Sequence, residues 1–139
     1  IEHRLFDTGS SILGANGGVV GDIVKFGGTS TTAGKVYYLK PDSTWGEAQA
    51  NAGATASGSL AIALGSNSTT NGMCLRGIIH PSTDPGAGVG SPVFLSDAAS
   101  GRMLATAPDT SGDIVRILGH QFGTDLIYFN PSPDFIEVS

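Results

Sequence analysis

The sequence predicts an all-β fold, a single antiparallel β-barrel or sandwich built from an internal duplication of about residues 34–79 and 90–130. Two observations predict this class. Apolar residues occur in short clusters rich in β-branched and aromatic side chains, and glycine or proline lies in nearly every gap between them. Several of these clusters also recur in the same order in the second half of the chain. The length of 139 residues fits one ordinary domain.

Each apolar cluster is predicted to be one strand. These strands are expected at residues 23–26, 35–39, 60–64, 73–79, 93–95, 103–105, 113–118 and 126–129. The stretch 45–56 is rich in alanine but carries no apolar stripe at helical spacing, so it is predicted to be a strand followed by a loop. No helix longer than about two turns is therefore expected.

The internal repeat relates four segments by an offset of 54 to 57 residues. Residues 34–39 match 90–95, 45–50 match 102–107, 60–65 match 114–119, and 73–75 match 127–129. Each unit has one apolar face that it cannot bury alone, so the two units are expected to close on each other with approximate two-fold symmetry. Residues 1–20 lack this pattern and are predicted to form an extended N-terminal arm or a junction to a longer protein, which leaves 21–139 as the barrel domain.

The expected core consists of the large apolar members of the predicted strands. They are Ile23, Val36, Leu39, Ile62, Leu64, Leu75, Val93, Leu95, Val115, Ile117 and Ile127. The one cysteine, Cys74, lies in an apolar stretch and is expected to be an unpaired, buried thiol.

Charge and hydropathy argue against two classes of partner. Seven Lys and Arg against twelve Asp and Glu give a net charge of −5, and the basic residues are scattered singly along the chain. Tight binding of a phosphate backbone needs clustered cations, so no nucleic acid partner is expected. No apolar run approaches the roughly 18–20 residues that cross a bilayer, so no membrane insertion is expected either.

No catalytic, cofactor-binding or metal-binding set is predicted, and no cofactor. The histidines His3, His80 and His120 share no metal-ligand spacing. His80, Ser82 and Asp84 lie within one proline-bounded loop, whereas a hydrolytic triad is assembled from separate elements. A polar loop is therefore predicted there.

Other polar and glycine-rich positions are also weighed. Asp22 and Asp113 each follow a glycine and precede a strand, which is ordinary turn chemistry, with a metal role as the alternative. Residues 86–90 lack the preceding strand and following helix of a dinucleotide loop. Trp45 is expected in the core, with an exposed sugar-stacking role as the alternative. The loops most suited to a ligand are 51–59, 66–71 and 81–90.

Six short motifs occur along the chain in an order that indicates a family resemblance. They are residues 7–10 (DTGS), 21–27 (GDIVKFG), 33–39 (AGKVYYL), 60–65 (LAIALG), 72–77 (GMCLRG) and 127–131 (IYFNP). The ordered set resembles the C-terminal module of tail-fibre-type virion structural proteins of tailed bacteriophages, those of marine phages and cyanophages in particular. The likeness spans nearly the whole chain.

The resemblance implies a non-enzymatic, β-rich structural domain of the phage virion that is commonly displayed as a trimer. The function expected from it is that of a tail-fibre tip module for host-surface attachment, with other virion proteins and a host-surface glycan or protein receptor as partners. The alternative function is a capsid decoration or cement protein that stabilises the phage head. A small secreted hydrolase is a third class, disfavoured because no catalytic constellation is present.

In a homotrimer, the N-terminal arm is expected to pack against an adjacent subunit. This packing would cover apolar side chains that a lone domain leaves exposed. The side chains concerned are Leu5, Phe6, Ile12 and Leu13.

Overall fold

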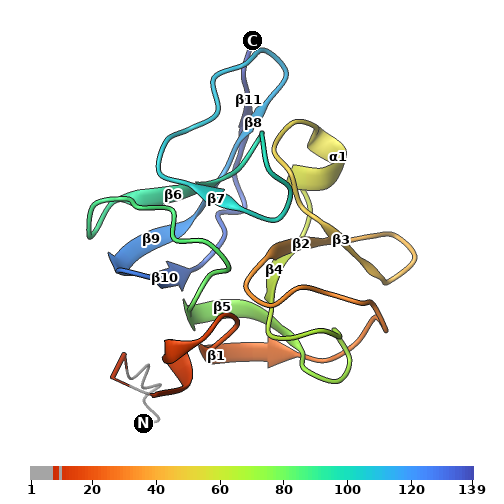
Figure 1. Ribbon diagram of the computed structural model, residues 1–139. Helices are drawn as coiled ribbons and strands as arrows, with labels where there is room; N and C mark the ends of the chain where they lie inside the picture. Colours follow the sequence, from red (N-terminus) through yellow and green to blue (C-terminus); the bar gives the residue numbers. More distant parts are fainter. Residues whose placement is uncertain (1–7, 10) are drawn as a thin grey trace, which may run out of the picture.

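A computed structural model describes residues 8, 9 and 11–139 of the chain, and its architecture is all-β (Figure 1). The strands are β1 Val19–Val24, β2 Val36–Leu39, β3 Trp45–Glu47, β4 Leu60–Ala63, β5 Met73–Ile79, β6 Pro92–Leu95, β7 Met103–Leu104, β8 Ile114–Val115, β9 Ile117–Gly123, β10 Leu126–Phe129 and β11 Ile136–Glu137. The helical elements of the described residues are a 3-10 turn, η1 Ser11–Gly14, and one turn of α-helix, α1 Gly53–Ala56. The predicted fold class is thus confirmed, and the predicted loop after β3 contains a helical turn.

All strand pairs are antiparallel, and within the described residues nine strands form one curled sheet in the order β3-β2-β4-β5-β10-β9-β6-β7, with β1 paired to β5. The order repeats between its two halves. In the first half, β2 lies between β3 and β4, and β4 pairs with β5. In the second half, β6 lies between β7 and β9, and β9 pairs with β10. The β5–β10 pair joins the two halves, which lie to the right and left of Figure 1 and curl into a half-barrel.

The strand register shows the repeat more sharply than the sequence does. Val36 lies opposite Ile62 in the first half, and Val93 lies opposite Gly119 in the second, so both partners are displaced by 57 residues. The expected match of residues 60–65 with 114–119 is wrong by three positions, because the counterpart of β4 is β9. Residues 114 and 115 instead form β8, which pairs with β11 near the C-terminus.

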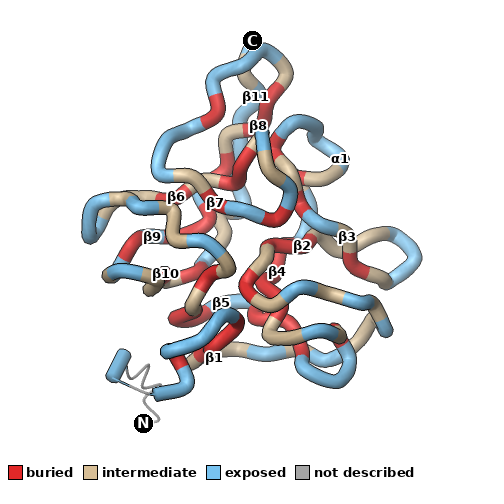
Figure 2. Tube along the Cα trace, in the orientation of Figure 1, coloured by how far each residue is buried: buried red, intermediate tan, exposed pale blue. Residues whose placement is uncertain are grey.

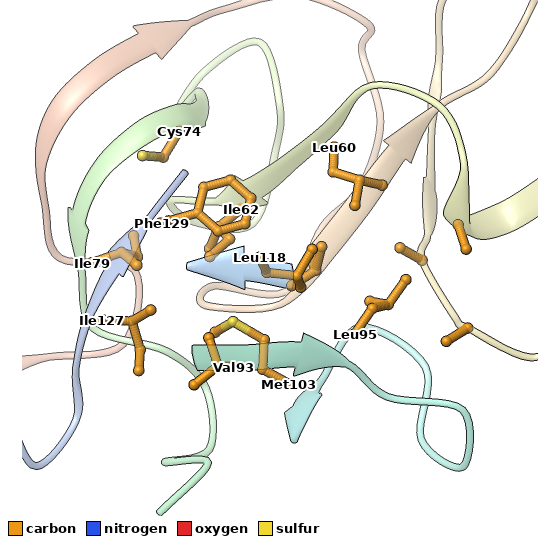
Figure 3. Packing of buried hydrophobic residues seen from close by; sticks show 14 of the residues in the cluster. Leu60, Ile62, Cys74, Ile79, Val93, Leu95, Met103, Leu118, Ile127 and Phe129 are labelled. Atoms are coloured by element: carbon orange, nitrogen blue, oxygen red, sulfur yellow. The ribbon is translucent and has the colours of Figure 1, made fainter. Parts of the chain in front are cut away.

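The main core lies between the two halves and takes side chains from both of them (Figures 2 and 3). Five of the predicted core residues are fully buried: Val36, Ile62, Val93, Leu95 and Ile127. Three others are partly buried at the margins: Leu39, Leu64 and Val115.

Three predicted core residues are exposed instead: Ile23 (49%), Leu75 (39%) and Ile117 (38%). Leu75 is displaced by a bulge, because Asp22 lies opposite Arg76 while Ile23 lies opposite Cys74, which leaves Leu75 without a partner across the pair. Ile117 lies next to the buried Leu118 on β9 and therefore points to the outer face. Ile23 lies opposite the buried Cys74, but it belongs to β1, which pairs with β5 alone and leaves this side chain exposed.

A second, smaller cluster covers the outer face of the first half. Tyr37, Trp45 and Ala61 are buried there under Phe26, which belongs to the segment that follows β1. The Trp45 indole lies 5.3 Å from the Phe26 ring, and its Nε1–H donates to the Phe26 carbonyl at 3.2 Å. The backbone of Gly27 lies against the same indole, where a Cβ would be 2.8 Å from the ring. The segment after β1 is thus a cover for this half of the sheet.

The described part of the predicted N-terminal arm is not uniformly exposed. Val19 and Val20 belong to β1, and Leu13 is buried within its own chain. Leu13 therefore needs no neighbouring subunit to cover it, contrary to expectation, whereas Ile12 is exposed (56%). Leu5 and Phe6 lie outside the described residues.

Candidate functional site

The loop that carries His80, Ser82 and Asp84 does not assemble a catalytic triad. Nδ1 of His80 lies 2.9 Å from the Pro81 carbonyl oxygen. The Asp84 carboxylate accepts hydrogen bonds from the Gln121 side chain (2.9 Å) and from a backbone amide, and these contacts lower its pKa against the effect of burial. No hydrogen bond joins His80, Ser82 and Asp84 to one another in the part of the chain that the structure describes.

The other histidines and aspartates lie apart. His120 is exposed on β9, and His3 falls outside the described residues. Asp22 lies on β1, 3.9 Å from the Arg76 guanidinium, whereas Asp113 precedes β8 at the opposite end of the molecule (Figure 1). Among residues 8, 9 and 11–139, no group of three or more His, Cys, Asp or Glu side chains is placed to hold a metal ion.

Asp113 is a buried carboxyl group beside another acid. Burial raises its pKa, and the hydrogen bond and charge of the neighbouring Asp97 raise it further. One of its oxygens, Oδ2, has no hydrogen-bond partner. This pair destabilises the ionised form of Asp113 and does not resemble a cation site.

The two remaining side chains singled out by the sequence are in the core. Trp45 is 3% exposed, so the alternative of an exposed sugar-stacking platform is wrong. Cys74 is an unpaired thiol, as expected, and burial raises its pKa to about 12.

A hollow of about 540 Å³ lies where the C-terminal segment meets the start of β4 and the middle of β5. Its walls combine charged, polar and aliphatic groups: Asp22, Ser59, Leu60, Leu75, Arg76, Arg116, Asn130, Pro131 and Pro133. The 51–59 loop reaches the hollow through Ser59, whereas the loops 66–71 and 81–90 do not contribute to it.

Arg116 is the unusual residue in this wall, because it is 5% exposed. Nε donates to the Ser132 carbonyl at 2.8 Å, and Nη1 donates to the carbonyls of Ala56 (2.8 Å) and Gly58 (2.5 Å). Burial lowers the pKa of the guanidinium group. Arg116 thereby ties the α1 turn and the C-terminal segment to the β8–β9 junction. Sequence reasoning missed it, although an arginine inside the apolar run 114–118 was a visible signal.

A second, apolar groove of about 250 Å³ lies on the outer face of the second half. The residues that line it are Phe94, Val115, Ile117, Ser132, Asp134, Phe135 and Ile136. Phe94 lies opposite Ile117, as Tyr37 lies opposite Ala61 in the first half. The first-half pair is buried under Phe26, whereas Ile117 stays exposed and the C-terminal segment covers this face only in part.

Comparisons with protein-family models, with curated proteins and with solved structures find no match to the chain. No helix within the described residues is long and apolar enough to span a membrane.

Proposed function

We propose that the protein is a non-enzymatic structural domain of a phage virion, a trimeric tail-fibre-type tip module displayed for host-surface attachment. Two independent lines support this proposal. The ordered motifs resemble such modules over nearly the whole chain. The observation that carries the assembly is the apolar face over β6 and β9, which the C-terminal segment covers only in part.

The comparison between the two halves explains why this face calls for a partner. Equivalent strand pairs have equivalent outer faces, and the first half covers its own face with the segment after β1. The second half leaves Ile117 (38%) and Ile136 (66%) exposed beside each other in one groove. Contiguous exposed apolar surface rimmed by polar groups is typical of a protein–protein contact.

A second copy of the chain is the partner that we assign to this face. In a three-fold assembly, each copy contacts its neighbour through two different surfaces. The groove of one copy can therefore be covered by another surface of the next copy, and two grooves need not face each other. Three copies at a fibre tip also multiply weak contacts with a host surface, so each binding site can be shallow. The virion is the location that follows from this proposal.

The apolar face is tested by the matched substitutions Ile117→Glu and Val89→Glu. Both replace an exposed β-branched residue by an acid, but Val89 lies in the 81–90 loop outside the groove. We expect Ile117→Glu to shift the particle from three chains to one while its far-UV spectrum is unchanged, and Val89→Glu to keep three chains. A trimeric Ile117→Glu variant with unchanged heat stability contradicts the assignment of this face.

A capsid decoration or cement protein is the alternative, in which the same apolar groove would contact the subunits of a phage shell. The gene context and the binding behaviour of the purified protein distinguish the fibre module from the cement protein. Repeats or coiled coil encoded upstream of Ile1, together with adsorption of the purified protein to host cells, support the fibre module. A short independent gene, and binding to phage shells without adsorption to cells, support the cement protein.

A further inference from the structure

Arg116 carries a buried charge that no acidic side chain balances in the described part of the chain. Its three hydrogen bonds all go to backbone carbonyls, and they use Nε and Nη1 alone. The remaining nitrogen, Nη2, donates to no acceptor among the described residues. Arg116 is 5% exposed as a residue, and an arginine this buried without an acidic partner is uncommon, because buried charges are usually paired. Nη2 is the nitrogen of this side chain that is left to bind a ligand.

The 540 Å³ hollow lies at this guanidinium and is within the size range of small-ligand sites. Asn130 and Ser59 add an amide and a hydroxyl group, which donate to and accept from the hydroxyls of a ligand. Leu60, Leu75 and Pro131 add aliphatic surface, against which the C–H groups of a sugar ring can pack. The wall therefore offers both charge and ring contacts.

The local charge of the hollow is opposite to that of the chain. The protein has a net charge of −5, but the hollow gathers Arg76 and Arg116 against the single carboxylate of Asp22. The Asp22–Arg76 contact is long, at 3.9 Å, and both side chains are about two-fifths exposed, so it is weakly neutralising. The buried Arg116 is screened far less than these two groups.

We propose that this hollow binds a carboxylate-bearing sugar, with the carboxylate on Arg116 Nη2 and Arg76 and the ring on the aliphatic wall. Asn130 and Ser59 hold the ring hydroxyls. The inference rests on the proposed function for the source of the ligand, an acidic glycan of the host surface, and assigns to that function its ligand class.

The test is an NMR titration of the full chain with three small probes. Sodium glucuronate carries the carboxylate and the ring, acetate carries the carboxylate alone, and glucose carries the ring alone. We expect glucuronate to shift the amide signals of Leu60, Leu75 and Asn130 saturably in the millimolar range, at least tenfold more tightly than either partial probe. Higher salt should weaken this binding, because the contact is between charges.

Four variants locate the binding. Arg76→Gln and Asn130→Ala should each weaken glucuronate by several fold, whereas Asp22→Asn should strengthen it by removing the opposing carboxylate. Arg102→Gln is the matched control, since Arg102 is an exposed arginine outside the hollow and the substitution removes the same charge as Arg76→Gln. These variants keep the test independent of Arg116, whose replacement would also release the three carbonyls.

Several results overturn the inference: no saturable shift with glucuronate, equal binding of acetate or glucose, or equal effects of Arg76→Gln and Arg102→Gln. Adsorption to host cells that glucuronate does not compete away overturns this site and leaves the proposed function intact. Saturable glucuronate binding by a protein that adsorbs to no host cell overturns the proposed function and leaves the site intact.

Discussion

Phe129→Ala is the substitution that tests most directly how the two halves pack together. Phe129 lies on β10 and is fully buried, in the core cluster that also holds Ile62 of β4, Ile79 of β5 and Leu118 of β9 (Figure 3). Truncation of a buried phenylalanine removes its transfer free energy and leaves a cavity, at a cost of about 3–5 kcal/mol. Because whole domains are stable by only about 5–15 kcal/mol, this loss is a large share of the total.

The assay is urea unfolding at 25 °C, followed by far-UV circular dichroism. Phe122→Ala is the matched control, because Phe122 lies on β9 with 46% of its surface exposed and its ring stacks on that of Tyr128, at 5.7 Å. Loss of that ring pair should cost no more than about 1.5 kcal/mol. If Phe129→Ala does not fold, Phe129→Leu gives the same ranking at a smaller cost.

A cost below about 1 kcal/mol for Phe129→Ala, or a cost no larger than that of the control, refutes the packing between the halves, since surface substitutions stay near this range.

Three further predictions concern single sites. Because burial raises the pKa of Cys74 to about 12, its thiol at pH 8 should react with a disulfide reagent about a thousandfold more slowly than a peptide thiol, and labelling at the peptide rate contradicts the burial. The free energy of unfolding should also fall as pH rises from 9 toward 12, since the thiol ionises at lower pH in the unfolded chain than in the folded one. Because burial and a neighbouring acid raise the pKa of Asp113, Asp113→Asn should raise Tm at pH 7, and the gain should vanish below pH 3.8, where the wild-type carboxyl is protonated in both the folded and the unfolded state. Calorimetry at both pH values tests this prediction, and an equal gain in Tm at both overturns it. Gly34→Ala should lower Tm more than Gly28→Ala. Both glycines have positive φ (83° and 55°), but only at Gly34 would a Cβ meet backbone, 2.3 Å from the Ser82 nitrogen. Equal decreases in Tm would show that the backbone at Ser82 can move away.

The strands that sequence reasoning located best are those whose signal is local. Residues 73–79 and 126–129 form β5 and β10 with the predicted bounds, because each is an apolar cluster bounded by turn residues, with only Arg76 and Gly77 interrupting the first. The predicted repeat is present in the structure, where the orders β3-β2-β4-β5 and β7-β6-β9-β10 correspond. Its register was wrong by three positions in the third segment, because residues 114 and 115 form the separate strand β8 and the counterpart of β4 begins at Ile117.

Local sequence patterns could not predict the candidate site, because its contacts join residues that are far apart in the chain. The carbonyls that hold Arg116 belong to residues 56, 58 and 132, which lie up to 60 positions away in the chain. The burial of Trp45 also depends on a distant segment, because Phe26 folds over it from the loop after β1. The strand β11 was missed since its two residues, Ile136 and Glu137, are exposed and form no apolar cluster.

The mass of the protein in solution tests the proposed assembly most directly. Light scattering of the wild-type chain at micromolar concentration should report three copies of the 14.1-kDa chain, about 42 kDa, because a second copy is proposed to cover the groove around Ile117. A single species of 14.1 kDa across the micromolar range would contradict the trimer and leave that apolar face without its assigned partner.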